Sequence, residues 1–132
     1  MSIKKEEDPI MNTWEDLGFR ILHVGINADN EEAAWKLADE FDQAFGFTPR
    51  DNHLTIFASP LIEIMKQDGP GTKGHIALGC NNLEDSIAYL IERGLHVDEE
   101  TTKKYDPDGK LRVAYFKEEI GGFKYHLKEN QK

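Results

Sequence analysis

Hydrophobic positions recur along this chain with two spacings, every second residue as in a strand and every third or fourth residue as in a helix. The same order of strand and helix spacings occurs twice. Apolar side chains spaced three or four residues apart predict an amphipathic helix that begins after an N-cap at Asp29 and ends at Gly46. The same spacing predicts a second helix that begins after Asn82 and ends at Gly94. The chain therefore contains two helices of similar design, one in each half.

Apolar runs with strand character lie on both sides of each predicted helix. The strand before the first helix begins at His23, and the strand before the second begins at His75 in a similar apolar run. Turn residues divide the remaining apolar runs into six further strands, predicted at 47–50, 54–58, 61–65, 95–98, 111–117 and 123–128. Each half is thus predicted to be β-α-β-β-β, with 66–73 as the connector, and the fold class is α+β.

Length and charge restrict what such a chain can be. Its 132 residues suffice for one domain, which we expect at 18–132 after a flexible N-terminal tail at 1–17. A net charge of -9 and the lack of a basic stripe argue against nucleic-acid and anionic-membrane partners. The chain has no apolar run near the roughly 20 residues of a membrane span and no secretory signal at its start. We therefore expect a cytoplasmic protein.

Four ionisable residues occupy comparable positions within the predicted strands. His23, Glu63, His75 and His126 each lie on a strand face that is small or polar, while their sequence neighbours form the opposite, apolar face. Burying such groups without partners is costly, and a first-row divalent metal would satisfy all four. Each residue taken alone has a simpler interpretation as an exposed or hydrogen-bonded side chain, and the four side chains together can also hydrogen-bond to one another without a metal.

The remaining histidines and the cysteine lack this context. His53 lies beside a turn and His96 follows a helix-ending glycine, so both are expected on the surface. Cys80 has no evident activating partner and no second cysteine to pair with, so we expect a buried strand residue in a reducing compartment. None of the three enters the candidate site.

Four short stretches resemble the glyoxalase and bleomycin-resistance family, also called the vicinal oxygen chelate superfamily. The resemblance covers about residues 19 to 129 and rests on His23-Val-Gly-Ile, Leu61-Ile-Glu63-Ile-Met65, Gly74-His-Ile-Ala-Leu-Gly79 and Gly122-Phe-Lys-Tyr-His126-Leu. It implies two β-α-β-β-β modules, at about 18–66 and 74–130, that form an open, cupped mixed sheet around one divalent metal, with the helices outside. It also implies a homodimer, because members of the family commonly pair and some exchange modules between chains.

The implied metal ligands come from the first and last strands of each module, and they are His23, Glu63, His75 and His126. The last position departs from the family, since bacterial glyoxalase I and the ring-opening dioxygenases have a glutamate there. That departure puts the hemithioacetal isomerase activity in doubt. Three histidines and one glutamate would suit zinc, nickel, cobalt or manganese. The run from Glu118 to Phe123 looks most like the glyoxalase-like domain attached to ketodeoxyphosphogluconate aldolases in some bacteria.

The resemblance implies that the metal chelates two neighbouring oxygens of a small oxo-compound, in a reaction of the lyase or isomerase type. Glu63 is the expected catalytic base, because it is the only carboxylate in the implied ligand set. Arg112, Lys124 and Lys128 are candidate substrate-binding residues that favour an anionic ligand, and their alternative interpretation is solvated charge at strand ends.

A second function remains open, namely a non-catalytic module that binds a small molecule or serves as an accessory in sugar-acid and aldolase metabolism. A metal with open coordination positions would favour catalysis, and a closed four-ligand site would favour a structural or sensing role. The segments 66–73 and 101–110 are expected to determine the ligand.

Overall fold

The computed structural model describes residues 13–100, 104–105 and 111–130. The secondary-structure elements follow one another in the order β1 (Arg20–Asn27), α1 (Glu31–Phe45), β2 (Arg50–Asn52), β3 (Thr55–Ser59), β4 (Ile62–Met65), β5 (Gly74–Cys80), α2 (Leu83–Glu92), β6 (Lys104–Tyr105), β7 (Leu111–Ile120) and β8 (Phe123–Glu129). Most of the predicted tail and most of the 101–110 segment lie outside the described residues.

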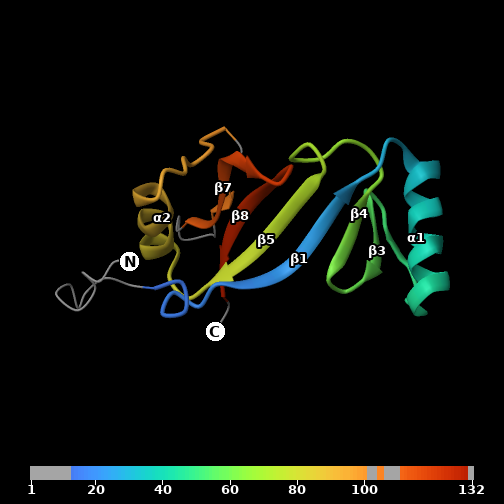
Figure 1. The fold of residues 1–132 in the computed structure, drawn as a ribbon, viewed down its shortest axis with the longest axis horizontal. Coiled ribbons are helices and arrows are strands. Elements are labelled where there is room, and N and C mark those ends of the chain that lie inside the picture. The colour runs from blue at the N-terminus through green and yellow to red at the C-terminus, as the bar shows by residue number, and fades with distance from the viewer. Residues whose placement is uncertain (1–12, 101–103, 106–110, 131–132) are drawn as a thin grey trace.

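All eight strands belong to one mixed sheet. Their order is β2-β3-β4-β1-β5-β8-β7-β6, so each module contributes one half of the sheet and the first strands of the modules meet in the middle. β1 and β5 pair antiparallel, whereas β1 with β4 and β5 with β8 pair parallel. The predicted fold, two β-α-β-β-β modules in one open mixed sheet, is confirmed. Figure 1 shows β1 and β5 in the centre of the molecule and the two helices at its opposite ends.

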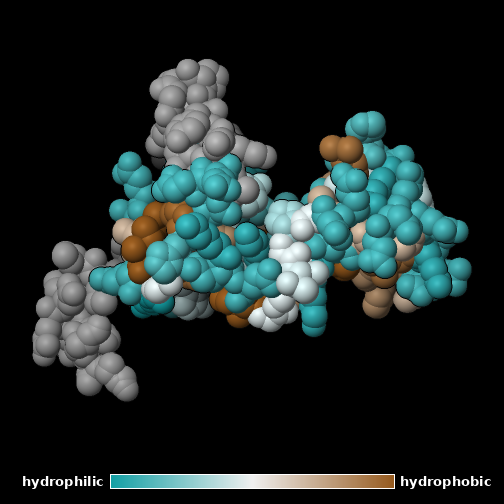
Figure 2. All heavy atoms as spheres, turned by 90° about the horizontal axis from the view of Figure 1, so that it is seen from above, coloured by the Kyte–Doolittle hydropathy of each residue, from teal (hydrophilic) through white to brown (hydrophobic). Residues whose placement is uncertain are grey.

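The helices cover the outer parts of the sheet, where the hydrophobic cores lie. α1 packs on β3 and β4, and α2 packs on β7 and β8. Ile56 and Ile64 are fully buried under α1, and Phe116 and Leu127 are almost fully buried under α2. Seen from above, the molecule has two lobes joined by a narrower middle, with a largely hydrophilic surface (Figure 2). The middle of the sheet is thus held mainly by strand pairing between β1 and β5.

The predicted helix boundaries hold at two of four positions, and the C-cap of α2 is Arg93, one residue before the predicted Gly94. Gly46 ends α1 in the left-handed conformation, at φ 78°, and its N–H donates to the Asp42 carbonyl. Asn82 caps α2 as predicted. The N-cap of α1 is Asn30 rather than the predicted Asp29, since the extended backbone of Asn30 lets its side chain accept from the Ala33 N–H at 2.8 Å. Aspartate and asparagine are comparable N-caps, so the residue types do not distinguish Asp29 from Asn30. The backbone conformation determines which of the two caps the helix.

Two predicted strands were placed wrongly. The strand predicted at 47–50 is Arg50–Asn52, which pairs with β3. The segment predicted at 95–98 makes only an isolated bridge, between Val97 and Phe116, and the strand beside β7 is Lys104–Tyr105. β2 and β6 are the edge strands of the sheet, and each is hydrogen-bonded to one neighbour only, β3 and β7 respectively. The position of that neighbour determines which segment pairs with it.

The residues just before β1 pack on the domain. Thr13 accepts a hydrogen bond from the Leu17 N–H at 3.0 Å, and the Leu17 side chain is buried. The Leu17 carbonyl in turn accepts from the Asn81 N–H at 2.8 Å, which joins this turn to the end of β5. Trp14, by contrast, is exposed. Within the described part of the chain, no helix is both long and apolar enough to cross a membrane.

Candidate metal centre

Strand register brings two predicted ligands to either side of one glycine. Gly25 of β1 is paired with Glu63 of β4 on one side and with His75 of β5 on the other. Paired residues in neighbouring strands point to the same face of a sheet, so the two side chains lean over a position that has no side chain of its own. This row of three residues is the floor of the candidate site.

A second row, two residues along the strands, contains the other two predicted ligands. Ala77 of β5 is paired with His23 of β1 and with His126 of β8. His126 is therefore the counterpart of Glu63 in the second module, and Ala77 is the counterpart of Gly25. The repeat inferred from the histidine strands is thus present in the strand pairing itself.

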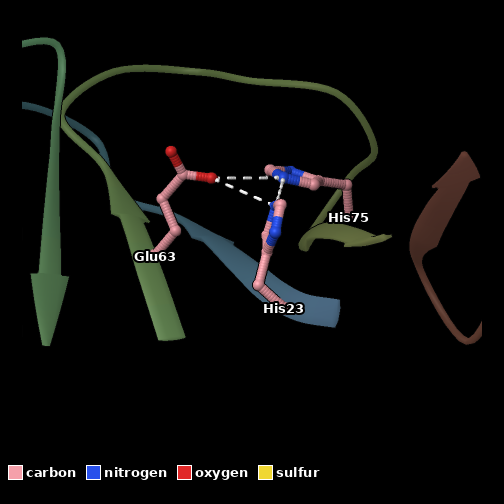
Figure 3. A group of neighbouring side chains, drawn as sticks. All are labelled: His23, Glu63 and His75. Carbon is pink, nitrogen blue, oxygen red and sulfur yellow. Dashed lines mark hydrogen bonds and ion pairs between the residues drawn. The ribbon is translucent and has the colours of Figure 1, made fainter. Parts of the chain in front are cut away.

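His23, Glu63 and His75 converge on one point (Figure 3). The two histidine Nε2 atoms are 3.3 Å apart, and Glu63 Oε1 lies 3.4 Å from His23 Nε2 and 3.5 Å from His75 Nε2. The three atoms form a nearly equilateral triangle, contributed by β1, β4 and β5. Figure 3 shows the second carboxylate oxygen of Glu63 pointing away from both imidazoles.

The size of this triangle fits a small divalent cation. A tetrahedral zinc with ligands at about 2.0 to 2.1 Å separates neighbouring ligand atoms by about 3.3 to 3.4 Å, whereas octahedral geometry at the same bond length gives about 2.9 Å. The measured separations of 3.3, 3.4 and 3.5 Å agree with the tetrahedral value. Two imidazoles and one carboxylate are also a ligand set that zinc accepts, with a further position left for water or substrate.

The protonation states favour metal binding. Burial lowers the pKa of the His23 imidazole below its usual value, although the Glu63 carboxylate acts in the opposite direction. Interaction with the His75 imidazole lowers the pKa of the Glu63 carboxyl and outweighs the effect of burial. At neutral pH the site therefore offers a neutral His23 nitrogen and an ionised Glu63, which are the forms that coordinate a cation.

His126 lies beside these three ligands. Among the described residues, the group whose ligand atoms all lie within 4.8 Å of one another consists of His23, Glu63 and His75. The His126 ring centroid is 5.9 Å from that of His23 and 5.6 Å from that of His75, and the Tyr115 ring lies 4.6 Å away on another side. Coordination by His126 stays a prediction, and its ring contributes to the wall of the site.

The three candidate ligands line a pocket of about 390 Å³ on the face of the sheet opposite the helices. The pocket is lined by His23, Glu63, Met65, Pro70, His75, Val113, Tyr115, His126 and Lys128. Such a volume suits a small molecule. The candidate metal site therefore faces a space in which a small molecule can reach it.

The three predicted substrate-binding cations lie in different surroundings. Lys128 lines the pocket. Neither Lys124 nor Arg112 lines the pocket. Lys124 lies 3.6 Å from the Asp98 carboxylate, and Arg112 donates to Glu129 at 2.8 Å. Of the three, Lys128 is the one placed to contact a bound anion.

Sequence reasoning missed the residues that hold the connector over the pocket. Asn27, at the end of β1, donates to the Gly71 carbonyl at 2.9 Å and accepts from the Gly69 N–H at 3.2 Å. These bonds position Pro70, which lines the pocket. Strand alternation was the signal available in the sequence, since it places Asn27 on the same face as His23 and Gly25. The connector that Asn27 contacts is rich in glycine.

Comparisons with known proteins identify the fold. The sequence matches no protein-family model and no curated protein. A hypothetical protein from Bacillus halodurans has a similar structure, with a TM-score of 0.56, 16% identity and coverage of 87% of this chain and 96% of that chain. A methylmalonyl-CoA epimerase gives a TM-score of 0.53 at 15% identity, covering 85% of this chain and 95% of that chain.

The methylmalonyl-CoA epimerase from Mycobacterium tuberculosis gives a TM-score of 0.52 at 13% identity, with 93% of each chain covered. Similarities at this level of identity establish the fold and leave the reaction open. The arrangement of two paired modules around a central site agrees with the resemblance seen in the sequence. The protein has a glyoxalase-like fold.

Proposed function

We propose that this protein is a divalent-metal-dependent enzyme of the isomerase or lyase type that acts on a small, anionic oxo-compound. The observation that carries the proposal is the triangle of His23 Nε2, Glu63 Oε1 and His75 Nε2, with separations of 3.3 to 3.5 Å, at the base of a pocket. A bound zinc, nickel, cobalt or manganese ion would supply Lewis-acid polarisation of two neighbouring substrate oxygens.

The protein's own residues then have separate roles. His23 and His75 hold the ion from adjacent strands, and Glu63 is the candidate base that moves a proton at the substrate carbon next to the polarised group. The second oxygen of Glu63 points away from both histidines (Figure 3), so the carboxylate has one oxygen for the ion and another for the proton. Met65, Val113 and Pro70 supply apolar walls that limit access of water.

Lys128 supports an anionic substrate. It lines the same pocket as the three ligands, in a chain whose net charge is -9. The ammonium group of Lys128, at the edge of this pocket, would attract a carboxylate or phosphate and orient it toward the candidate metal ligands. The names of two similar structures describe an epimerase, which favours isomerisation over bond cleavage as the reaction type.

Metal content and proton exchange test this proposal together. The purified parent protein is assayed for metal, and 2-oxo acids and their 2-hydroxy and phosphorylated relatives are incubated with it in D₂O while NMR follows deuterium uptake. We expect about one metal per chain, and exchange that disappears in Glu63→Gln. His53→Ala serves as the control, because His53 lies outside the site at an exposed turn.

The outcomes separate the candidate functions. Metal binding with no exchange or conversion of any compound would leave the non-catalytic binding module, including an accessory role in sugar-acid or aldolase metabolism. No metal after reconstitution with zinc, nickel, cobalt or manganese would refute the enzyme proposal. The homodimer and the cytoplasmic location remain proposals, and light scattering of the purified protein tests the first of them.

A further inference from the structure

We propose that Gly25 is a positioning residue, because its missing side chain is what allows His75 to turn its Nε2 atom toward the other two ligands. The inference rests on the metal site proposed above, and it concerns a residue that is not itself a ligand. Its evidence is a steric contact, a buried Nδ1 atom without a hydrogen-bond partner among the described residues, and a difference between the two modules.

The steric contact involves three atoms of the imidazole ring. A Cβ atom built on Gly25 would lie 2.0 Å from His75 Cε1, 2.4 Å from Nδ1 and 2.6 Å from Nε2. Real Cβ contacts essentially never fall below about 3 Å, so any side chain at position 25 must displace the ring. The His75 imidazole therefore lies directly over the backbone of β1.

In the described part of the chain, the Nδ1 side of this ring is not held by a hydrogen bond, and its polar contacts are at Nε2, with His23 and Glu63. A metal-ligating histidine usually donates its second ring N–H to a carboxylate or carbonyl, which sets the direction of the coordinating nitrogen. The Nδ1 atom of His75 is buried, and within the described residues it has no hydrogen-bond partner. Packing against the Gly25 backbone therefore restrains the part of the ring where the usual Nδ1 hydrogen bond is missing.

The two modules differ at this position. In the strand register His75 lies opposite Gly25, whereas His23 lies opposite Ala77, which has a methyl group. The side chain of His75 is 7% exposed and that of His23 is 27% exposed. The deeper position of His75 is what the absence of a methyl group at position 25 permits.

The central experiment compares zinc affinity and the visible spectrum of the cobalt(II) form in three proteins: the parent, Gly25→Ala and Gly79→Ala. Gly79→Ala is the matched control, because its new Cβ would also meet a side chain closely, that of Asn130 at 2.6 Å just after the end of β8, and contacts no candidate ligand. We expect Gly25→Ala to lose about 100-fold in zinc affinity, as loss of ligand orientation does in other metal sites. We expect its cobalt spectrum to lose the tetrahedral signature, and Gly79→Ala to stay within about threefold of the parent.

Equal zinc affinity in Gly25→Ala and the parent would overturn the inference. A second measurement separates the contact from the metal site, namely the Tm of the metal-free proteins with and without His75. Gly25→Ala should lower the Tm when His75 is present. It should leave the Tm unchanged or raise it in the His75→Ala background, where the clash is gone and the unfolded chain is less flexible.

This second measurement also covers the other outcomes. If Gly25→Ala fails to fold but folds in the His75→Ala background, the contact is supported. An equal Tm effect in both backgrounds would overturn it, because Gly25 would then matter only for its strand. If the parent itself binds no zinc, the proposed function fails, while the Tm comparison still decides whether Gly25 positions His75.

Discussion

Zinc should stabilise this protein by an amount that the fold allows us to estimate. The ligands come from three strands and two modules, so the unfolded chain does not hold them together and the ion binds the folded state preferentially. At a free zinc concentration of 100 times the Kd, the added stability is about 2.7 kcal/mol. Unfolding entropy is about 2.1 cal/mol/K per residue, which for 132 residues amounts to about 0.28 kcal/mol/K. The expected rise in Tm is therefore about 10 °C.

Thermal unfolding followed by circular dichroism, with chelator and with excess zinc, measures this shift. His75→Ala should abolish it, because two ligand atoms remain of three, whereas His53→Ala should retain it in full. A shift below about 2 °C in the parent, or an undiminished shift in His75→Ala, would refute the reasoning, since zinc would then bind elsewhere or equally well to the unfolded chain.

Three further predictions concern the scaffold and its pH dependence. Ile64→Ala should cost about 3 kcal/mol in urea unfolding, since Ile64 is fully buried, and Leu61→Ala, at a side chain 58% exposed, should cost under about 1 kcal/mol. Glu129→Gln should cost about 1 to 2 kcal/mol in the same assay, because it removes the negative charge that pairs with Arg112 at 2.8 Å and lies at the start of α2. The lowered pKa of His23 means that the folded protein binds fewer protons than the unfolded chain just below pH 6.5. Metal-free stability should therefore fall as the pH drops below about 6.5, and less steeply in His23→Gln.

Features that depend on short stretches of chain were predictable from the sequence. Strand alternation around His75 correctly indicated a face of small residues beside the candidate ligand, and glycine after an amphipathic run correctly ended α1 at Gly46. The exposed positions of His53 and His96 followed from the neighbouring turn and helix end. In each case the deciding interaction lies within a few residues, so the information is local.

Features that depend on register between strands were not predictable. Arg112 was grouped with Lys128, yet Val113 is the residue paired with Lys128, so Arg112 points to the other face and bonds to Glu129. A shift of one residue in strand pairing exchanges the two faces, and nothing in the β7 sequence alone sets that pairing. The contact between Gly25 and His75 has the same origin, because it exists only once β1 and β5 are aligned.

The matching rows of the two modules have a consequence for how such a site arises in evolution. If the site were formed by two identical single-module chains, every substitution would appear on both sides of the pocket. A glutamate on one side would then require a glutamate on the other. Joining both copies in one chain removes that constraint, and here Glu63 faces Gly25 while its counterpart His126 faces Ala77. One gene can thus assign different chemistry to the two sides of a single pocket.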